Sequence, residues 1–383
     1  MQLVNADITQ QGDVLELIWQ DHSRSRFHAL WLRDNAQDAH TRSASNGQRL
    51  ITLADISPDI RIDVVDVSDN TLSVRFSPCD TCCVFSAQWL DEHCYDKTKF
   101  SDTGRLPDNT IVFDSQLQLE QVSARYENIV TDKNRRKDWL QSLVSYGFAR
   151  LTEGPIEEEA LFKVAKLIGY VRETNYGKLF EVRNQPSPEN LAYTSDGLQA
   201  HTDNPYRDPV PTLQLLYCLD NSAKGGESQV VDGFNAALQL KALNPYYFEL
   251  LSSYCVNFEY RGQSDTVLQS SMPIIELRSD GELRCIRFNN RSTSAITGVP
   301  FDKMQDFYKA YRAFGELIND TAAHVQFKLN PGECFVVDNS RVLHARSAFE
   351  LDNDGSGRWL QGCYIEKDGL LSSLAVLKAE LSN

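Results

Sequence analysis

Residues 190–206 read NLAYTSDGLQAHTDNPY, and the prediction of the fold starts from this stretch. It contains His201-Thr202-Asp203, a His-x-Asp pair. Side chains alternate between the two faces of a β-strand, so residues two apart on or just after a strand point the same way. One short segment therefore supplies an imidazole and a carboxylate on one side of the chain.

A third ligand is needed to hold a metal ion, and His344 in FVVDNSRVLHARSAF (335–349) is the natural candidate. Two histidines and one carboxylate on one side of an ion leave three positions open, which is the ligand set of non-heme Fe(II) oxygenases. Arg358 follows His344 by fourteen residues, in GRWLQGCYIE. This spacing suits a cosubstrate carboxylate held beside the iron.

Other residues of the same types are assigned structural roles. A histidine in an alternating strand is more often a packed core residue than a ligand. Arg346, two residues after His344, is too close to the metal to hold the far carboxylate of a cosubstrate, so we expect it to contact the metal ligands at most. The histidines interpreted as core or surface residues are His22, His28, His40, His93 and His324.

Alternating runs between turn residues predict many short strands after Gly169, including a hairpin at Asp280-Gly281. Periodic apolar residues predict helices that pack outside these strands. Gly147 should end the first helix, and acidic residues should occupy the first turn of the second. We therefore expect a mainly β fold with flanking helices, built on a double-stranded β-helix, or jelly roll. The expected helices cover 138–146, 157–171, 235–253, 300–320 and 370–381.

The first part of the chain predicts a separate, small β-rich domain. RFHALWLRDN (26–35), IRIDVVDVSD (60–69) and NTLSVRFSP (70–78) alternate as half-buried strands do. Ser86 is a plausible N-cap for a short helix over 86–95. A chain of 383 residues is long enough for two domains. We assign 1–98 to the N-terminal domain and 99–383 to the jelly-roll domain.

Composition excludes several classes of partner. With 38 basic and 53 acidic residues, the formal charge of −15 argues against nucleic acid and anionic membranes. There is no run of eighteen apolar residues and no signal-peptide pattern at the N-terminus, so we expect a cytoplasmic protein. Nine cysteines without an export signal favour free thiols.

Several motifs in one order resemble the γ-butyrobetaine hydroxylase-like branch of the Fe(II)/2-oxoglutarate dioxygenases. The resemblance runs over nearly the whole chain. The motifs are WLRDN (31–35), YGxxF (176–180), NLAYT and HTD (190–203), GGESQVVDGF (225–234), FNN (288–290), NPGECFVVDNSRVLHAR (330–346) and GRWLQGCY (357–364).

The resemblance implies roles for individual residues. His201, Asp203 and His344 would bind Fe(II), and Arg358 would pair with the distal carboxylate of 2-oxoglutarate. Ser228 lies where related enzymes often have a hydroxyl near the cosubstrate. The resemblance further implies O2 as the oxidant, stimulation by ascorbate, and a homodimer.

The family's substrates carry a trimethylammonium group, which cannot donate hydrogen bonds and is recognised by aromatic faces. The corresponding cage positions here are Tyr176, Phe180, Tyr193 and Tyr364. Phe180 stands where the butyrobetaine enzymes have tryptophan. Most aromatic residues serve packing alone, but four that match one family's cage predict a binding site.

The sequence departs from the family at the other end of the substrate. Asn190 and Asn290 match residues that hold a carboxylate in butyrobetaine hydroxylases. Asn204 replaces a tyrosine, and Arg291 replaces a small residue. A short amide opens space and a guanidinium adds charge and donors, which favours a phosphonate.

The pattern resembles that of enzymes that hydroxylate 2-(trimethylamino)ethylphosphonate, and we predict this quaternary ammonium compound as substrate, hydroxylated at C1. γ-Butyrobetaine, converted to L-carnitine, is the alternative. Arg291 as a surface arginine ending a strand is the competing interpretation.

Mammalian relatives bind a structural zinc in the N-terminal domain. The corresponding positions here are Ala36, Asp38, Thr41 and Thr81, which cannot provide a tetrahedral site of soft or imidazole ligands. A different site formed by Cys79, Cys82 and Cys83 with His40 or Asp38 is the alternative, but a CxxC motif without a second pair is weak evidence, so we expect no zinc.

Two other functions fit the sequence less well. A non-catalytic sensor of quaternary ammonium compounds would be expected to lose a metal ligand or the cosubstrate arginine, and this chain retains all of them. An enzyme acting on sulfonates, like taurine dioxygenase, is disfavoured by the cage tyrosines and the N-terminal domain.

Overall fold

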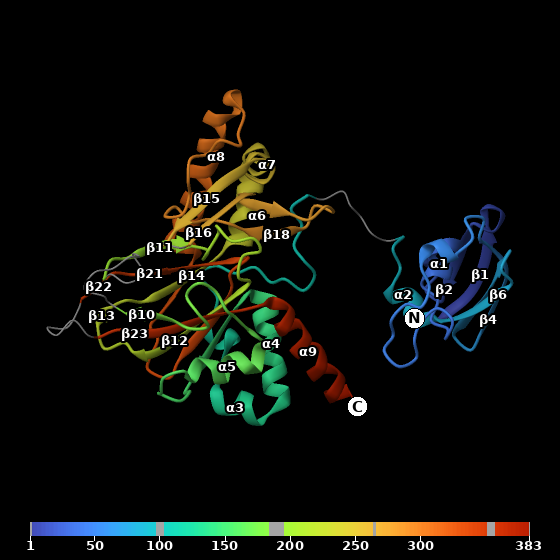
Figure 1. Cartoon of the computed structure of the whole chain (residues 1–383), viewed down its shortest axis with the longest axis horizontal. Coiled ribbons are helices and arrows are strands. Elements are labelled where there is room, and N and C mark those ends of the chain that lie inside the picture. Colours follow the sequence, from blue (N-terminus) through green and yellow to red (C-terminus); the bar gives the residue numbers. More distant parts are fainter. Residues whose placement is uncertain (1, 97–102, 184–194, 263–265, 351–356, 383) are drawn as a thin grey trace. The chain divides into compact units, whose positions relative to one another are not determined.

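The computed structural model describes residues 2–96, 103–183, 195–262, 266–350 and 357–382. The chain forms two compact units, residues 1–100 and 101–383, and each is described by itself (Figure 1). The boundary lies two residues after the expected one. Within the described ranges, no helix combines the length and apolar character needed to cross a bilayer.

The N-terminal unit packs two antiparallel sheets around one apolar core. The first sheet has the order β1 (Leu3–Thr9), β2 (Val14–Trp19) and β3 (Arg24–His28). The second has β4 (Arg61–Ser68), β5 (Thr71–Ser77) and β6 (Thr81–Ser86). Short 3-10 turns cover Gln10–Gly12 and Leu53–Asp55. The expected strands over 60–69 and 70–78 are thereby confirmed.

Two short helices complete this unit, and one of them corrects the sequence prediction. Strand β3 ends at His28, and α1 (Ala29–Asp34) follows where a continuous strand was expected. Ala29 and Leu32 are both buried, a three-residue spacing that suits a helix packed on the core. Helix α2 (Ala87–Glu92) begins as predicted, with the Ser86 side chain accepting from the Trp89 amide.

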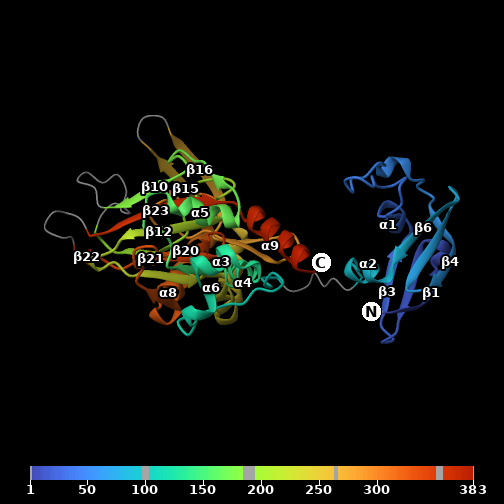
Figure 2. The ribbon, with the colours of Figure 1, turned by 90° about the horizontal axis from the view of Figure 1, so that it is seen from below.

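The larger sheet of the second unit has the order β10 (Phe180–Arg183), β23 (Trp359–Ile365), β12 (Leu213–Asp220), β20 (Cys334–Asp338), β8 (Phe148–Thr152) and β7 (Ser123–Arg125). Strand β9 (Val171–Arg172) also pairs with β23. All these pairings are antiparallel except β7 with β8. Figure 2 shows β10, β23 and β12 side by side.

The smaller sheet has the order β11 (Leu198–His201), β21 (Val342–Arg346), β14 (Ser228–Asp232) and β19 (His324–Phe327). Apolar residues from both sheets meet in one core, including Leu216 and Phe335 from the larger sheet and Val230 and Val325 from the smaller. Two antiparallel layers facing one another form the expected double-stranded β-helix.

Helices cover the outer sides of both layers (Figure 1). Helices α3 (Tyr126–Thr131), α4 (Lys133–Tyr146), α5 (Ala160–Ile168) and α9 (Lys367–Ser382) lie on the side of the larger sheet. Helices α6 (Gly233–Leu243), α7 (Pro245–Ser253) and α8 (Phe301–Asn319) lie on the side of the smaller one.

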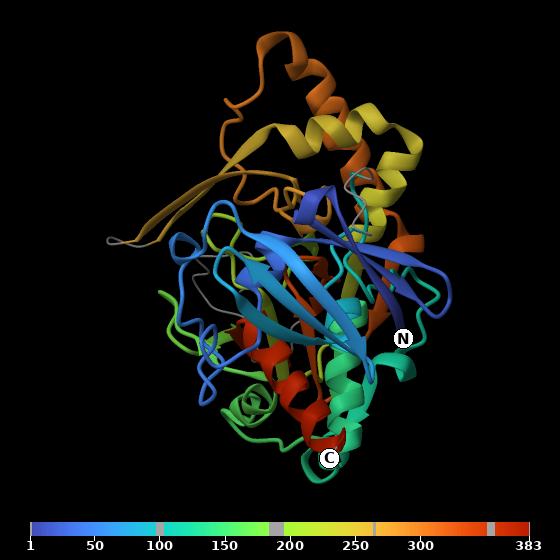
Figure 3. The ribbon, with the colours of Figure 1, turned by 90° about the vertical axis from the view of Figure 1, so that its right-hand side faces the viewer.

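The remaining elements are short pairs and turns. The hairpin of β15 (Cys255–Arg261) and β16 (Val267–Pro273) extends from the unit in Figure 3. A second hairpin joins β17 (Ile275–Leu277) and β18 (Leu283–Ile286) at the predicted Asp280-Gly281 turn. Strands β13 (Lys224–Gly225) and β22 (Phe349–Glu350) pair, and 3-10 turns cover Leu119–Val122 and Thr321–Ala323.

Two helix predictions need correction. The expected helix over 235–253 is two helices, because Pro245 has no amide hydrogen to continue α6 and the Asn244 side chain instead caps α7. The acidic residues before α5 do not form its first turn. Glu159 has φ 63 and its amide donates to Gln361 Oε1, a tertiary contact that starts the helix at Ala160. Gly147 ends α4 in the left-handed region, as predicted.

A buried ion pair anchors the smaller sheet. Arg341 binds both oxygens of Asp232, at 3.0 and 2.7 Å, and neither side chain is more than 3% exposed. Arg341 also donates to the carbonyls of Ser145 and Ile111, and Asp232 caps α6. Because Arg341 precedes β21, the pair fixes the start of the strand that carries His344.

Removal of one partner should destabilise the second unit strongly. Asp232→Ala leaves a buried guanidinium without its counter-charge, which costs about 3–5 kcal/mol. Urea unfolding followed by helical circular dichroism measures this, because the long helices α4, α8 and α9 all belong to this unit. Asp306→Ala, which removes an exposed pair with Lys309, is the matched control and should leave the midpoint nearly unchanged. Equal midpoints for both variants would contradict the anchoring role.

Candidate active site

Strand pairing brings His201 and His344 together. Strands β11 and β21 are antiparallel neighbours in which His201 lies directly opposite His344. Directly opposed residues project from the same face of a sheet. The two imidazole rings have centroids 4.4 Å apart. Asp203 lies just beyond the end of β11, so the predicted convergence of the His-x-Asp pair is present.

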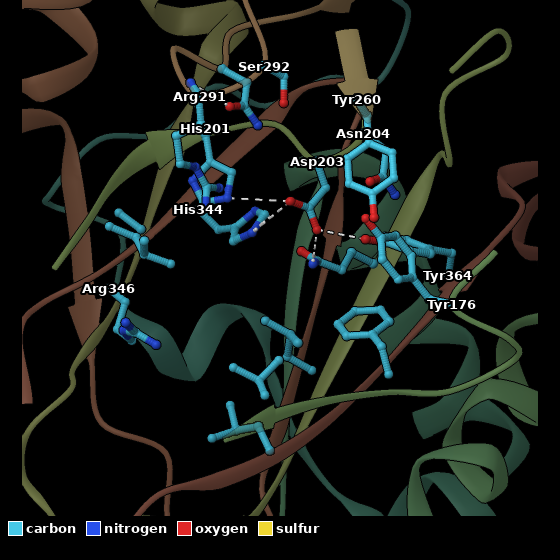
Figure 4. A pocket seen from close by; sticks show the side chains of 18 of the residues that line it. Tyr176, His201, Asp203, Asn204, Tyr260, Arg291, Ser292, His344, Arg346 and Tyr364 are labelled. Atoms are coloured by element: carbon cyan, nitrogen blue, oxygen red, sulfur yellow. Dashed lines mark hydrogen bonds and ion pairs between the residues drawn. The ribbon is translucent and has the colours of Figure 1, made fainter. Parts of the chain in front are cut away.

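The three side chains present their donor atoms to one point (Figure 4). Asp203 Oδ1 lies 3.4 Å from His201 Nε2 and 3.9 Å from His344 Nε2, and all three ligand atoms lie within 4.8 Å of one another. Coordinating bonds of roughly 2.1 Å would place neighbouring donors about 3 Å apart, so a small inward movement completes the site. His201 Nδ1 lies 2.8 Å from the carbonyl of Gln199, which leaves Nε2 for a metal.

The electrostatic state of these groups suits a cation. Burial would raise the pKa of Asp203, but the hydrogen bond with His201 and the nearby His344 and Arg291 outweigh it and lower the pKa. Burial lowers the pKa of His344 to about 3, so this ring is neutral at physiological pH. A charged carboxylate and a neutral imidazole are the forms that bind Fe(II).

The metal ligands line a pocket of about 590 Å³ between the two sheets. The larger sheet contributes Gln214, Leu216, Phe335 and Leu360, and the smaller sheet contributes Ser228 and Ala345 beside its histidines. Of the predicted site residues, those that line the pocket are Tyr176, Phe180, His201, Asp203, Asn204, Ser228, Arg291, His344, Arg358 and Tyr364.

One part of the pocket is cationic. Arg346 is the cross-strand partner of Ser228, and both line the pocket with Arg358. The guanidinium carbons of Arg346 and Arg358 lie 5.0 and 5.5 Å from the ring centre of Phe349. Burial lowers the pKa of both arginines to about 10, and the positive charge of Arg358 and Arg291 adds to the effect on Arg346.

These arginines fit an anionic cosubstrate. The buried Arg358 Nε has no hydrogen-bond partner within the described part of the chain. A buried guanidinium is stable only when paired, so Arg358 is suited to a carboxylate. Arg346 was expected to touch only the metal ligands, but it lines the same pocket and donates to the Asp196 carbonyl.

Another part of the pocket is aromatic. Phe180 and Tyr364 have ring centres 5.1 Å apart. Tyr260 packs edge-on against Tyr176 at 6.0 Å and stacks on Tyr206 at 5.0 Å. Sequence patterns predicted neither Tyr206 nor Tyr260 as a residue of this pocket. Tyr193 and Asn190, predicted for the same site, lie outside the described residues.

The residues predicted for the substrate anion divide into two groups. Arg291 lines the pocket, and Figure 4 shows it beside the two histidines. Asn204 is buried in the pocket and accepts from the Tyr206 hydroxyl at 2.5 Å. Asn290, however, is exposed and absent from the lining, with its Oδ1 accepting from Tyr311 at 2.9 Å. The neighbouring Asn289 lines the pocket instead and donates to the Thr202 carbonyl, and the chain turns at Asn290.

Gln214 is a further site residue that the sequence analysis missed. It donates to Asp203 Oδ2 at 2.6 Å. In the buried part of β12, LQLLYCL (213–219), it is the one polar side chain apart from the tyrosine hydroxyl and the cysteine thiol. A lone amide in a buried apolar run needs a partner, and this was a readable signal for a role in the site.

The N-terminal positions considered for zinc are used differently. Asp38 accepts from the Thr41 hydroxyl at 2.9 Å and from the Cys83 thiol at 3.4 Å, and Ala36 is buried in the core. All nine cysteines are free thiols. Within the described ranges, His201, Asp203 and His344 form the group with metal-binding geometry. The expectation that no zinc binds stays a prediction.

Comparison with known proteins agrees with this geometry. Residues 114–364 match the family described as taurine catabolism dioxygenase TauD, TfdA family, and residues 6–91 match the γ-butyrobetaine hydroxylase-like N-terminal family. The chain is 32% identical to human γ-butyrobetaine dioxygenase over 99% of this chain and 98% of that protein.

Two other relatives have comparable coverage. γ-Butyrobetaine dioxygenase of Pseudomonas sp. strain AK-1 is 32% identical, over 95% of this chain and 94% of that protein. Mitochondrial trimethyllysine dioxygenase of Gallus gallus is 30% identical, over 96% and 86%. Together with the His-Asp-His site, these similarities show that the chain belongs to the TauD/TfdA family of Fe(II)/2-oxoglutarate-dependent dioxygenases, in its γ-butyrobetaine hydroxylase-like branch.

Proposed function

We propose that this enzyme hydroxylates a small trimethylammonium compound that carries an anionic group, with 2-(trimethylamino)ethylphosphonate, hydroxylated at C1, as the favoured substrate. 2-Oxoglutarate and O2 are consumed, and succinate and CO2 are released. One observation carries the proposal. In the pocket, aromatic rings lie on one side of Asp203, and the two histidines with Arg291 beside them lie on the other side (Figure 4).

The aromatic cluster suits a quaternary nitrogen. Such a group has no hydrogen to donate, so ring faces are its natural partners. Burial raises the pKa of Tyr206 to about 12 and that of Tyr364 well above its ordinary value, so the rings stay neutral phenols. Gly362 lies beneath Phe180, where an added Cβ would collide with the ring. The glycine therefore lets Phe180 lie flat against the sheet beside Tyr364.

The opposite side suits a doubly charged anion. Arg291 is close enough to the metal site to lower the pKa of both Asp203 and His344. Asn204, in contrast, lies among the tyrosines (Figure 4) and accepts from the Tyr206 hydroxyl, and its buried Nδ2 has no partner within the described residues. A phosphonate offers the Arg291 guanidinium more acceptor oxygens and more charge than a carboxylate does.

The third part of the pocket is assigned to 2-oxoglutarate. Arg358 would pair with its distal carboxylate, and the Ser228 hydroxyl would add a hydrogen bond. Bound Fe(II) supplies the activation of O2. The chain's own contribution is to fix the two organic molecules on either side of the metal, to exclude water between the sheets, and to hold the substrate carbon in place.

γ-Butyrobetaine is the second candidate. It is supported by the human and Pseudomonas relatives, which are named γ-butyrobetaine dioxygenases and are each 32% identical to this chain over nearly its whole length. A non-catalytic sensor remains the competing class, although the complete ligand set and the buried arginines argue for turnover.

Turnover with both compounds tests the proposal. The enzyme, loaded with Fe(II) and 2-oxoglutarate, should form succinate faster with 2-(trimethylamino)ethylphosphonate than with γ-butyrobetaine at equal low concentrations. Product identity is checked by NMR, which locates the new hydroxyl. A preference for γ-butyrobetaine ends the phosphonate assignment, and no succinate with either compound ends the trimethylammonium assignment.

Arg291→Ala should discriminate between the two anions. It should raise the KM for the phosphonate about tenfold, the lower end of the range for a charge-assisted contact, because solvent screens the exposed part of the side chain. The KM for γ-butyrobetaine should rise less. Arg278→Ala, a surface arginine paired with Glu282, is the control. An equal change for both substrates would remove Arg291 from anion recognition.

Arg358→Met should raise the KM for 2-oxoglutarate by more than about tenfold while changing the substrate KM little, because a buried charge-assisted pair is lost. Arg346→Met, at the neighbouring buried arginine, is the matched comparison. If Arg346→Met has the larger effect on the KM for 2-oxoglutarate, the distal carboxylate lies against Arg346 instead.

A further inference from the structure

The two oxygens of the Asp203 carboxylate have different surroundings. Oδ1 faces the imidazoles of His201 and His344. Oδ2 points away from them and accepts two hydrogen bonds, from Gln214 Nε2 at 2.6 Å and from the Tyr364 hydroxyl at 2.8 Å. The dashed lines of Figure 4 mark this arrangement. One oxygen is thus directed to the metal site and the other is fully engaged by the protein.

The two donors are set by the register of the larger sheet. Gln214 on β12 and Tyr364 on β23 are directly opposed residues, so their side chains leave the same inner face side by side. They are 2% and 5% exposed. Because Asp203 is ionised and can only accept, the amide of Gln214 must present its nitrogen to Oδ2.

The main chain of Asp203 is held independently. Its amide donates to Asn339 Oδ1 at 2.6 Å, and its carbonyl accepts from Asn339 Nδ2 at 3.0 Å. Asn339 is 1% exposed and also donates to the carbonyl of Pro211. Asn339 therefore fixes the position of the Cα, and what remains free is rotation of the side chain. Gln214 and Tyr364 act on that rotation.

We propose that Gln214 and Tyr364 are positioning residues that hold Asp203 as a ligand through Oδ1 alone. A carboxylate that turned to offer both oxygens would occupy one more coordination position. The two donors prevent this turn, because it would leave a buried amide and a buried phenol unpaired. Three positions then stay open for the cosubstrates.

This arrangement gives Tyr364 two roles. Its ring belongs to the aromatic cluster beside Phe180, and its hydroxyl belongs to the support of the metal ligand. Tyr364→Phe separates the two, because it keeps the ring and removes the hydroxyl. The positioning role concerns the metal site alone, so it can be tested without any substrate and does not depend on which trimethylammonium compound is used.

The test is Mn(II) affinity of the full-length protein, measured from the free-ion EPR signal without cosubstrates. Gln214→Leu and Tyr364→Phe should each raise the Kd for Mn(II) about 10–100-fold, the usual effect of losing an outer hydrogen bond to a metal ligand. Two matched controls are available in the same sheet. Gln361→Leu removes a buried amide that donates to Glu181 and accepts from the Glu159 amide, and Tyr217→Phe removes a hydroxyl that donates to the Pro155 carbonyl.

The melting temperature of the metal-free protein separates positioning from folding. A positioning role predicts an unchanged metal-free melting temperature in Tyr364→Phe and a smaller rise on adding Mn(II). A Kd within about twofold of the wild type in that variant overturns the proposal, as does an equal loss in the two controls. If Gln214→Leu does not fold, Tyr364→Phe alone decides the outcome.

Discussion

The cross-strand pairing of His201 with His344 is the contact on which the rest of the site depends. It joins β11, just past the middle of the chain, to β21 near its end and sets both imidazoles on the inner face of the smaller sheet. A shift of one residue in either strand would turn one of them outward. The Asp232–Arg341 pair fixes the start of β21, and Asn339 fixes the main chain of Asp203 just after β11, so both strands are anchored at the end of the pair where the ligands lie.

The pocket owes its rigidity to the same alternation that builds the core. On β12, Leu213, Leu215 and Tyr217 face the helices of the outer layer, while Gln214 and Leu216 face the pocket. Gln214 and Leu216 are therefore backed by neighbours on the same strand that pack under α4, α5 or α9. Packing of the outer face against the helices fixes the backbone of the strand. The conformational entropy lost in that step also positions the side chains on the pocket face.

The charge within the pocket contrasts with that of the whole chain. The formal net charge is −15, yet Arg291, Arg346 and Arg358 all line one cavity. Burial and mutual repulsion lower the pKa of Arg346 and burial lowers that of Arg358, so an arriving dicarboxylate relieves an unfavourable state. The aromatic part of the pocket favours a cation, because the faces of the rings are electron-rich. Under the proposed function, a substrate with a cationic and an anionic end would therefore take one orientation across the metal site.

Local patterns in the sequence determined much of this protein. Strand alternation, the turn at Asp280-Gly281, the caps at Ser86 and Gly147 and the His-x-Asp pair depend only on neighbours in the chain, and the structure contains each of them. The same patterns failed where the deciding contact was distant. Glu159 starts α5 late because Gln361 binds its amide, and α1 forms because Ala29 and Leu32 pack on a core made by other strands.

Only the tertiary structure decided which residues share the pocket. Tyr206, Tyr260 and Arg346 carry no local signature that separates them from packing residues, and Asn289 rather than Asn290 lines the pocket, because the chain turns at Asn290. The period of a strand tells which side chains share a face, and that is a local property. Which strand lies opposite, and in what register, depends on contacts between segments far apart in the chain.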